Sequence, residues 1–387
     1  MHAEIITIGN EILLGEIIDT NSRTIAKKLQ TIGLPLYYTA TVGDDLNRMA
    51  ESIKQGMARS EVVITTGGLG PTVDDLTREA MALATGRDLV FDEGLLAQIE
   101  ERFRRWNRPM TENNRKQAYR PEGSLAIENP VGTAPCFAIE RGGRIAISLP
   151  GVPREMEYLM DHSVLPLLRQ RFNLTGIIKS RELKVSGAGE SQVDMLVGDL
   201  ETLSNPTVGL NAHSGVIVIR ITASADSEAE ADKLIAPVES IARQRLGKLI
   251  FGADADTLEA VVLAELDSRG ETLAVVECGT GGRLAGKLAQ SAHGVNAFAG
   301  GKLTHLCGLH GPLEMARQAA TEAQTHWGLA CVLKDEGGVL QLGIGLWNLY
   351  HQEAWQRGFG GHSALASEWS ANLALDALRK VLSAEFK

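Results

Sequence analysis

The chain has 387 residues, of which 44% are hydrophobic and 22% charged, enough apolar material for two or three cores and unlike the composition of a disordered protein. Its formal net charge of -10 argues against a general nucleic-acid binder, because phosphate-backbone recognition requires clustered lysines and arginines. No apolar run approaches the roughly 20 residues of a membrane span, and no basic segment opens the chain, so we expect no membrane partner.

The four cysteines are far apart in the sequence and form no CxxC pair: Cys136, Cys278, Cys307 and Cys331. This spacing indicates neither a structural zinc site nor a disulfide framework. We therefore expect reduced thiols and a cytoplasmic location.

The first ~150 residues alternate short apolar runs with amphipathic helical stretches, which is typical of α/β proteins with a doubly wound, mostly parallel sheet. The predicted elements, in order, are strands over 4–9, 36–42, 61–66 and 144–149, with helices over 21–32, 46–59, 76–85 and from 153 to about 171. The carboxyl ends of parallel strands line one crevice, so we expect the turns that follow Ile8, Val42, Thr66 and Leu149 to face one ligand.

The remaining sequence predicts two smaller domains. Strands over 181–185 and 215–223 and an acidic helix over 227–246 indicate a small α+β domain. After a short linker, a helix over 257–269, a strand over 273–276 and a glycine turn indicate a second α/β region. The predicted domains therefore span 1–171, 172–252 and 253–387.

A glycine turn followed by two carboxylates is the strongest chemical signal in the chain. Gly67, Gly68 and Gly70 follow an apolar strand and have no Cβ atoms to keep a phosphate away from the backbone N–H groups. A helix is expected to begin at Pro71 and Asp74, and Asp74 and Asp75 offer oxygen ligands for a cation such as Mg²⁺. The alternative is a glycine turn with an aspartate N-cap that binds nothing.

Seven sequence blocks together resemble the CinA family, which is named after competence and damage inducibility. The blocks are GNEILLG (9–15), DTN (19–21), VGDD (42–45), GGLGPTVDDLTREA (67–80), NRKQA (114–118), NPVGTA (129–134) and LPGVP (149–153). The resemblance implies a molybdopterin-binding (MoCF) fold for the first domain, a KH-like fold for the second and a CinA C-terminal fold for the third.

The same resemblance implies an activity for each end of the chain. In CinA proteins the N-terminal domain is associated with metal-dependent hydrolysis of the pyrophosphate of ADP-ribose, and the C-terminal domain with deamidation of nicotinamide mononucleotide. A divalent metal, Mg²⁺ or Co²⁺, is therefore the implied cofactor, with K⁺ left open as a further cation. The implied partners are a small nucleotide substrate and a second copy of the chain in a homodimer.

Acidic candidates are carried over by position. By resemblance, Asp44 and Asp75 match the two acidic positions of the MoCF fold, and Glu11 joins them as a third catalytic candidate. Asp74, Asp75 and Asp44 are the metal candidates, because pyrophosphate cleavage needs a cation on the phosphoryl oxygens and a carboxylate on the attacking water. As alternatives, Asp44 and Asp45 cap the helix that starts at Leu46, and Glu11 is a solvated turn residue.

Further candidates are expected to contact the ligand. Gly67, Gly68, Gly70 and Thr77 match the phosphate-contacting turn of the family. Beyond that turn, the candidates are Gly9, Asn21, Asn114 and Lys116. Asn21 either caps its helix or contacts ligand, and the loop at Asn114 and Lys116 either neutralises a second phosphate or forms a solvated face.

The third region departs from its family at the positions that carry chemistry. Deamidating members have Glu-Ser-Cys-Thr-Gly-Gly, whereas this chain has Glu277-Cys278-Gly279-Thr280-Gly281-Gly282, so Cys278 replaces the serine nucleophile. The next three family blocks have become 304–307 (THLC), 334–338 (KDEGG) and 359–362 (FGGH), without the expected lysine and arginine. We therefore expect no deamidase activity and a domain kept for folding or assembly.

The sequence is compatible with three functions. The favoured one is hydrolysis of ADP-ribose to AMP and ribose 5-phosphate by the N-terminal domain. The others are a pterin- or nucleotide-binding protein without turnover and, by fold analogy, molybdopterin adenylyl transfer. A separate thiol site that uses Cys278 with His305 or His362 is the rival interpretation of the third region.

Overall fold

The computed structural model describes residues 1–293, 295–305, 310–360 and 362–384. The chain forms two compact units, one made of Met1–Lys179 with Ser224–Asp232 and the other of Ser180–Ala223 with Lys233–Lys387. Within the described ranges, no helix is long and apolar enough to cross a membrane.

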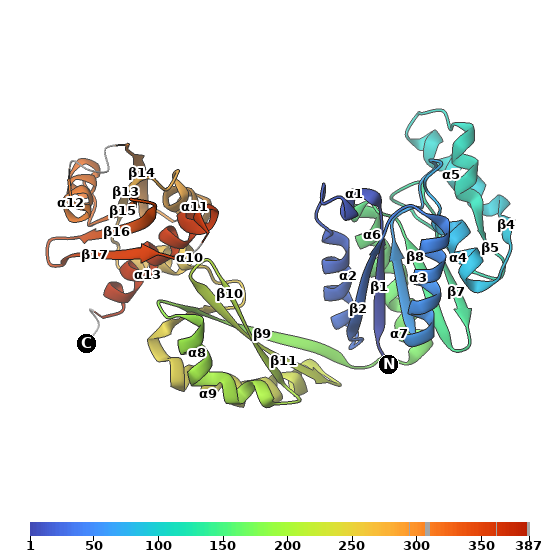
Figure 1. Cartoon of the computed structure of the whole chain (residues 1–387), viewed down its shortest axis with the longest axis horizontal. Helices are drawn as coiled ribbons and strands as arrows, with labels where there is room; N and C mark the ends of the chain where they lie inside the picture. The colour runs from blue at the N-terminus through green and yellow to red at the C-terminus, as the bar shows by residue number, and fades with distance from the viewer. Residues whose placement is uncertain (294, 306–309, 361, 385–387) are drawn as a thin grey trace. The chain divides into compact units, whose positions relative to one another are not determined.

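The N-terminal unit is built on a six-stranded sheet in the order β2-β1-β3-β8-β7-β6 (Figure 1). Its strands are β1 (Ala3–Ile8), β2 (Leu36–Val42), β3 (Val62–Thr66), β6 (Leu125–Ile127), β7 (Cys136–Arg141) and β8 (Arg144–Leu149). The pairs β1/β2, β1/β3 and β3/β8 are parallel, whereas β7 runs antiparallel to both β8 and β6. The sheet is therefore mostly parallel with an antiparallel edge, which confirms the predicted α/β class.

Helices cover both faces of this sheet because neighbouring residues of a strand point to opposite sides. The helices are α1 (Asn10–Leu13), α2 (Thr20–Gln30), α3 (Leu46–Arg59), α4 (Thr77–Thr85), α6 (Pro153–Leu159), η2 (Met160–Val164) and α7 (Leu165–Phe172). On β1, Ile5 packs into a core with Ile25 of α2 and Met156 of α6. The next residue, Ile6, packs into a second core with Met49 of α3.

The segment between α4 and β6 forms a small subdomain with its own core. It contains β4 (Leu89–Phe91), α5 (Glu93–Arg105), η1 (Glu112–Ala118) and β5 (Tyr119–Pro121). Leu95, Leu96, Ile99 and Ala118 form its buried cluster. The expected loop around Asn114 is wrong, because the 3-10 helix η1 occupies these residues and is stabilised by a capping box with Thr111.

A second sheet, of four strands in the order β10-β11-β9-β12, follows along the chain. Its elements are β9 (Ile177–Ser186), α8 (Glu190–Val197), η3 (Gly198–Thr202), β10 (Thr207–His213), β11 (Val216–Ala225), α9 (Glu228–Leu246), η4 (Gly247–Leu249) and β12 (Ile250–Ala253). The pairs β10/β11 and β12/β9 are antiparallel, as the predicted α+β character requires.

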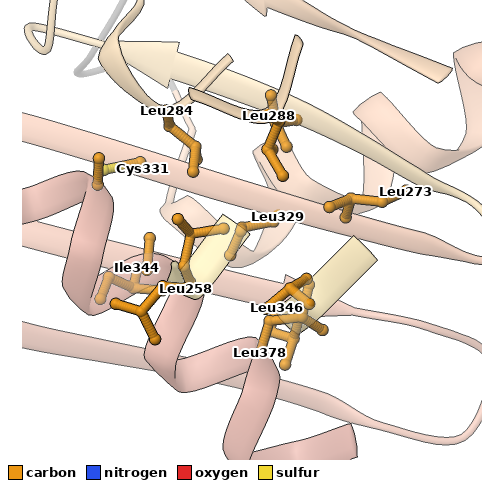
Figure 2. Close-up of a cluster of buried hydrophobic side chains, with 14 of the residues drawn as sticks. Leu258, Leu273, Leu284, Leu288, Leu329, Cys331, Ile344, Leu346 and Leu378 are labelled. Atoms are coloured by element: carbon orange, nitrogen blue, oxygen red, sulfur yellow. The ribbon is translucent and has the colours of Figure 1, made fainter. Parts of the chain in front are cut away.

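A third, mixed sheet has the order β14-β13-β15-β16-β17 within the described residues. Its elements are α10 (Leu258–Ser268), β13 (Leu273–Cys278), α11 (Arg283–Ser291), β14 (Phe298–Leu303), α12 (Pro312–Ala323), β15 (Trp327–Glu336), β16 (Val339–Trp347), β17 (Gln352–Phe359), η5 (Ser363–Leu365) and α13 (Ala366–Leu382). Figure 2 shows its core, where Leu258, Leu284 and Leu378 meet strand residues such as Leu329.

The alternation of Ile5 and Ile6 gives a test of the layered core. Ile5 is fully buried, so Ile5→Ala is expected to cost about 2–5 kcal/mol and lower the unfolding midpoint of the N-terminal unit. Ile18→Ala is the matched control, because Ile18 is 86% exposed. The measurement is urea unfolding followed by circular dichroism, and equal midpoints for the two variants would contradict this packing.

Candidate functional site

All seven sequence blocks contribute residues to one cavity of about 490 Å³ at the carboxyl ends of the parallel strands. Gly9 follows β1, Asp44 follows β2, Gly67 follows β3 and Pro150 follows β8, and all four line the cavity. The turns after the parallel strands therefore face one space, as expected for the crevice of an open parallel sheet.

Nine of the twelve predicted site residues line this cavity. They are Gly9, Glu11, Asn21, Asp44, Gly67, Gly68, Gly70, Asp74 and Asp75. The other three are Thr77, Asn114 and Lys116, which do not line it. Thr77 and Asn114 are buried, and all three take part in hydrogen bonds behind the glycine turn.

The glycine turn depends on glycine for two close approaches. Gly67 has a φ of +110°, and a Cβ there would lie 2.2 Å from the carbonyl oxygen of Ile8. Gly68 has a φ of +62°, and its Cβ would lie 2.4 Å from Thr77 Oγ1. Among the described residues, the N–H groups of Gly68, Leu69 and Gly70 have no acceptor. The turn therefore offers backbone donors of the kind that bind phosphate.

The carbonyl groups of the same turn are held from behind by side chains. Thr77 Oγ1 donates to Gly67 O at 2.8 Å, and Arg78 Nη2 donates to Leu69 O at 2.7 Å. Lys116 Nζ donates to Asp75 O at 2.6 Å and to Thr72 O at 3.2 Å. Because these side chains bind the carbonyl groups from behind the turn, the N–H groups of Gly68 and Gly70 point to the other side of the turn. Thr77 and Lys116 thus position the turn from outside the cavity lining.

Asn114 lies one step further back. Its Nδ2 donates to Gln117 Oε1 at 3.1 Å, and Gln117 Nε2 in turn donates to Leu69 O at 3.3 Å. Gln117 itself lines the cavity. Asn114 therefore orients the one residue of its block that reaches the cavity.

Arg78 places a buried positive charge under the turn, and sequence reasoning missed it. Its side chain is only 1% exposed, and burial lowers the pKa of its guanidinium to about 10, which leaves it charged at neutral pH. Among the described residues its Nε has no hydrogen-bond partner. This charge favours an anion on the other side of the turn. The sequence signal was an arginine directly after the turn-contacting Thr77.

The expected helix start at Pro71 and Asp74 is wrong. Helix α4 begins at Thr77, and Leu76 is its N-cap, with no side-chain capping bond. Instead, Thr72 engages the carboxylates, since its N–H donates to Asp75 Oδ2 at 2.8 Å and its hydroxyl donates to Asp75 and Asp74. Local bonds to Thr72 thus hold residues 72–75 in a turn that competes with the helix.

Asp44 and its neighbour Asp45 have different functions in the fold. The side chain of Asp45 caps α3 by accepting from Arg48 N at 2.9 Å. Asp44 does not cap α3 and accepts from Asn10 N at 3.0 Å. Burial raises the pKa of Asp44, and the negative charges of Glu11, Asp74 and Asp75 raise it further. The capping alternative therefore applies to Asp45 only.

The carboxylates offer a donor set that suits a hard divalent cation. However, no group of three or more His, Cys, Asp and Glu side chains is close enough to hold a metal within the part of the chain that the structure describes. Mg²⁺ is commonly bound by one or two carboxylates together with substrate phosphates. The residues Glu11, Asp44, Asp74 and Asp75 therefore fit a cation that substrate oxygens help to hold.

Glu155 is a further acidic residue of the cavity that sequence reasoning missed. It lies in the first turn of α6, lines the cavity and accepts from Asn129 Nδ2 at 2.6 Å. Burial raises the pKa of its carboxyl group. A Cβ on Gly132 would lie 1.9 Å from Glu155 Oε2, so glycine there lets the carboxylate pack closely. The available signal was its place just after the LPGVP block.

The third region has a hollow of about 380 Å³ around its own glycine turn, lined by residues 277–282, Leu303, Thr304 and His305. Glu277 is 1% exposed and accepts from the N–H groups of Leu284 and Ala285 at the start of α11. His362 is exposed, and its Nδ1 accepts from Ala364 N. Positions 306, 307 and 361 of the departing blocks lie outside the described residues.

The cysteines differ from one another. Cys136 and Cys331 are free and buried, and burial raises the pKa of each thiol far above its usual range. Cys278 is 1% exposed and disulfide-bonded, so the expectation of a chain without disulfides is wrong at this residue. In this state Cys278 presents no thiolate for the rival thiol site.

The charge cluster at Asp44 predicts an effect on stability. A carboxyl group with a raised pKa binds its proton more tightly in the folded state, so its ionisation costs stability at higher pH. Asp44→Asn is expected to raise the melting temperature at pH 7, and the gain should shrink as the pH falls through the raised pKa.

Asp45→Asn is the control for this prediction, because asparagine caps a helix as well as aspartate and should leave the melting temperature nearly unchanged. The measurement is thermal unfolding from pH 7 to the lowest pH at which the protein stays folded. A gain for Asp44→Asn that does not depend on pH would contradict the raised pKa of Asp44.

Comparisons with known proteins found two family models and a solved structure that match parts of this chain. The family described as "Probable molybdopterin binding domain" matches residues 4–170, and the damage-inducible protein CinA KH domain matches residues 180–252. The crystal structure of the protein CinA from Thermoplasma acidophilum is 38% identical and covers 43% of this chain and 97% of that chain, with a TM-score of 0.41.

Sequence relatives cover more of the chain. A competence-damage inducible protein of Clostridium botulinum (strain 657 / Type Ba4) is 45% identical over 306 residues, which are 79% of this chain and 74% of that protein. One from Halothermothrix orenii is 40% identical over 305 residues, 79% of this chain and 73% of that protein. These matches are longer than the first two domains together, so they extend into the third region. The chain belongs to the CinA family of competence-damage inducible proteins.

Proposed function

We propose that the N-terminal domain hydrolyses the pyrophosphate of a nucleotide, with ADP-ribose as the favoured substrate and AMP and ribose 5-phosphate as the products. The observation that carries this proposal is that one cavity is lined both by Gly68 and Gly70, whose N–H groups have no acceptor among the described residues, and by carboxylates. The carboxylates are Glu11, Asp44, Asp74 and Asp75. Donors suited to phosphate and acids suited to a cation and a water are what such a hydrolysis needs. The proposal includes a homodimer, as the family resemblance implies.

The residues of the cavity have separate roles in the proposed hydrolysis. The N–H groups of Gly68 and Gly70 bind a phosphate oxygen, with the charge of Arg78 behind them. A bound divalent ion, Mg²⁺ or Co²⁺, held by Asp75 and Asp74, would offset the charge that grows on the phosphoryl oxygens and leave Asp44 free to act on the water. Both carboxylates of the 74–75 pair are fixed beforehand by hydrogen bonds from Thr72.

Asp44 is the best candidate for the proton acceptor. A raised pKa makes a carboxylate a stronger base, and Asp44 has that property because of its burial and its acidic neighbours. In the proposed step, the water oxygen attacks a phosphorus atom while Asp44 takes one water proton. The bridging P–O bond breaks, and the phosphate that leaves carries the bond's electron pair.

The test is release of AMP from ADP-ribose by the full chain, with Mg²⁺ or Co²⁺ and after chelation. Asp75→Asn keeps an oxygen that can accept from Thr72 and removes only the charge, so the turn should stay folded. We expect this variant to lose activity by about 10²–10⁴-fold, and chelation to abolish activity in the wild type.

Asp45→Asn is the control for this assay, because Asp45 caps α3 and does not line the cavity. It should retain full activity. No release of AMP by the wild type with any divalent ion would reject the hydrolase. Binding without turnover would then favour the second candidate, a pterin- or nucleotide-binding protein. Release of pyrophosphate from ATP with molybdopterin would favour adenylyl transfer.

For the third region we propose no deamidation of nicotinamide mononucleotide. Two features support this: a cysteine in a disulfide stands in the place of the serine nucleophile, and Glu277 uses its carboxylate for the first turn of α11. The purified chain is expected to release no ammonia from nicotinamide mononucleotide, under oxidising conditions or with a reductant. Ammonia that appears only with reductant would favour the thiol site instead, and Cys278→Ala would then abolish it.

A further inference from the structure

The hydrogen bonds around Asn21 determine which way its amide faces. Its side chain is 7% exposed, and Nδ2 donates to Gly151 O at 2.8 Å and to Thr66 Oγ1 at 3.0 Å. A carbonyl oxygen can only accept, and the Thr66 hydroxyl uses its own hydrogen to donate to Pro150 O at 3.0 Å. Both neighbours therefore require the NH₂ group, and Oδ1 is on the opposite side of the amide.

Asn21 Oδ1 is thus an acceptor without a donor. Among the described residues nothing donates to it, although the atom is buried and the residue lines the cavity. Buried polar atoms in proteins are nearly always hydrogen-bonded. An unpartnered acceptor on a residue that lines a cavity is a candidate contact for a donor of a ligand.

Glu155 of α6 offers a second acceptor close in sequence to Gly151, which binds Asn21. Asn129 Nδ2 donates to Ala134 O at 3.0 Å, which fixes the amide, and also donates to Glu155 Oε2 at 2.6 Å. Among the described residues nothing donates to the other oxygen, Oε1, and the side chain is half-buried. Gly151, which binds Asn21, lies just before α6, the helix that carries Glu155.

We propose that Asn21 and Glu155 form an acceptor-only subsite that selects ligands by hydrogen-bond donors on their nucleoside part, either sugar hydroxyls or a base amine. The identification of this part as the AMP half of ADP-ribose rests on the proposed function. The glycine turn offers donors to phosphate, whereas this subsite, which begins at Asn21 beside Thr66, offers acceptors, so the two recognise different groups of one nucleotide. A cavity of about 490 Å³ has the size of a small-molecule site.

The experiment measures binding by calorimetry and needs no turnover. The probes are AMP, 2′-deoxy-AMP, 3′-deoxy-AMP and IMP, which remove one hydroxyl each or replace the exocyclic amine by a carbonyl. In Glu155→Gln the amide oxygen can still accept from Asn129, and the NH₂ group then takes the place of Oε1. This change turns an acceptor into a donor at nearly the same volume.

For the wild type, we expect at least one analogue to bind about tenfold more weakly than AMP, because a donor to a charged acceptor is lost. If a deoxy analogue binds weakly, the donor recognised by the subsite is a sugar hydroxyl. If IMP binds weakly, the donor is the exocyclic amine of the base. In Glu155→Gln the affinity for AMP should be less than about twofold higher than the affinity for that analogue. Glu157→Gln, an exposed glutamate on the same helix, should keep the wild-type ratio.

Three results would overturn the proposal: no measurable AMP binding by the wild type, equal affinity for all four probes, or an unchanged ratio in Glu155→Gln with a wild-type melting temperature. These results are independent of hydrolysis. Selective binding without AMP release would reject the proposed hydrolysis and support the subsite. AMP release with equal binding of all four probes would support the hydrolysis and reject the subsite.

Discussion

The close approach of Gly67 to the carbonyl oxygen of Ile8 is the contact on which the N-terminal site depends. Only a residue without Cβ can lie there, since the added atom would be 2.2 Å from that oxygen. The approach brings the turn after β3 against the end of β1, so that Gly9 and the carboxylate of Glu11 reach the same cavity. Without it, the two central turns of the sheet would separate and the phosphate donors would be lost.

The orientation of the turn is decided by what lies behind it. Thr77, Arg78 and Lys116 bind carbonyl groups of residues 67–75, and among the described residues the N–H groups of Gly68, Leu69 and Gly70 have no acceptor. The buried charge of Arg78 adds a positive potential in an otherwise acidic chain with a formal net charge of -10. An anion is therefore favoured by the local charge at this pocket and not by the overall charge of the chain.

The two glycine turns at 67–70 and 279–282 have similar sequences, but the acidic residues beside them make different hydrogen bonds. In the N-terminal unit, Asp74 and Asp75 bond to Thr72 within the turn, and the N–H groups of Gly68 and Gly70 stay available. In the third region, the carboxylate of Glu277 occupies the N–H groups at the start of α11. Glu277 therefore stabilises a helix start. An acidic residue beside a glycine turn is not by itself sufficient for a phosphate or metal site.

The sequence by itself determined the layered α/β fold of the N-terminal unit and the end of the sheet at which its site lies. Alternating residues such as Ile5 and Ile6 specify two buried faces, and strand boundaries specify which turns meet. Only the tertiary structure decided which side chains point into the cavity. Thr77 and Lys116 turn away behind the glycines, Asp74 does not start the helix, Arg78 becomes buried, and Glu155 becomes half-buried against Asn129. Each of these outcomes depends on partners distant in sequence, such as Asn129 for Glu155, and no local pattern encodes them.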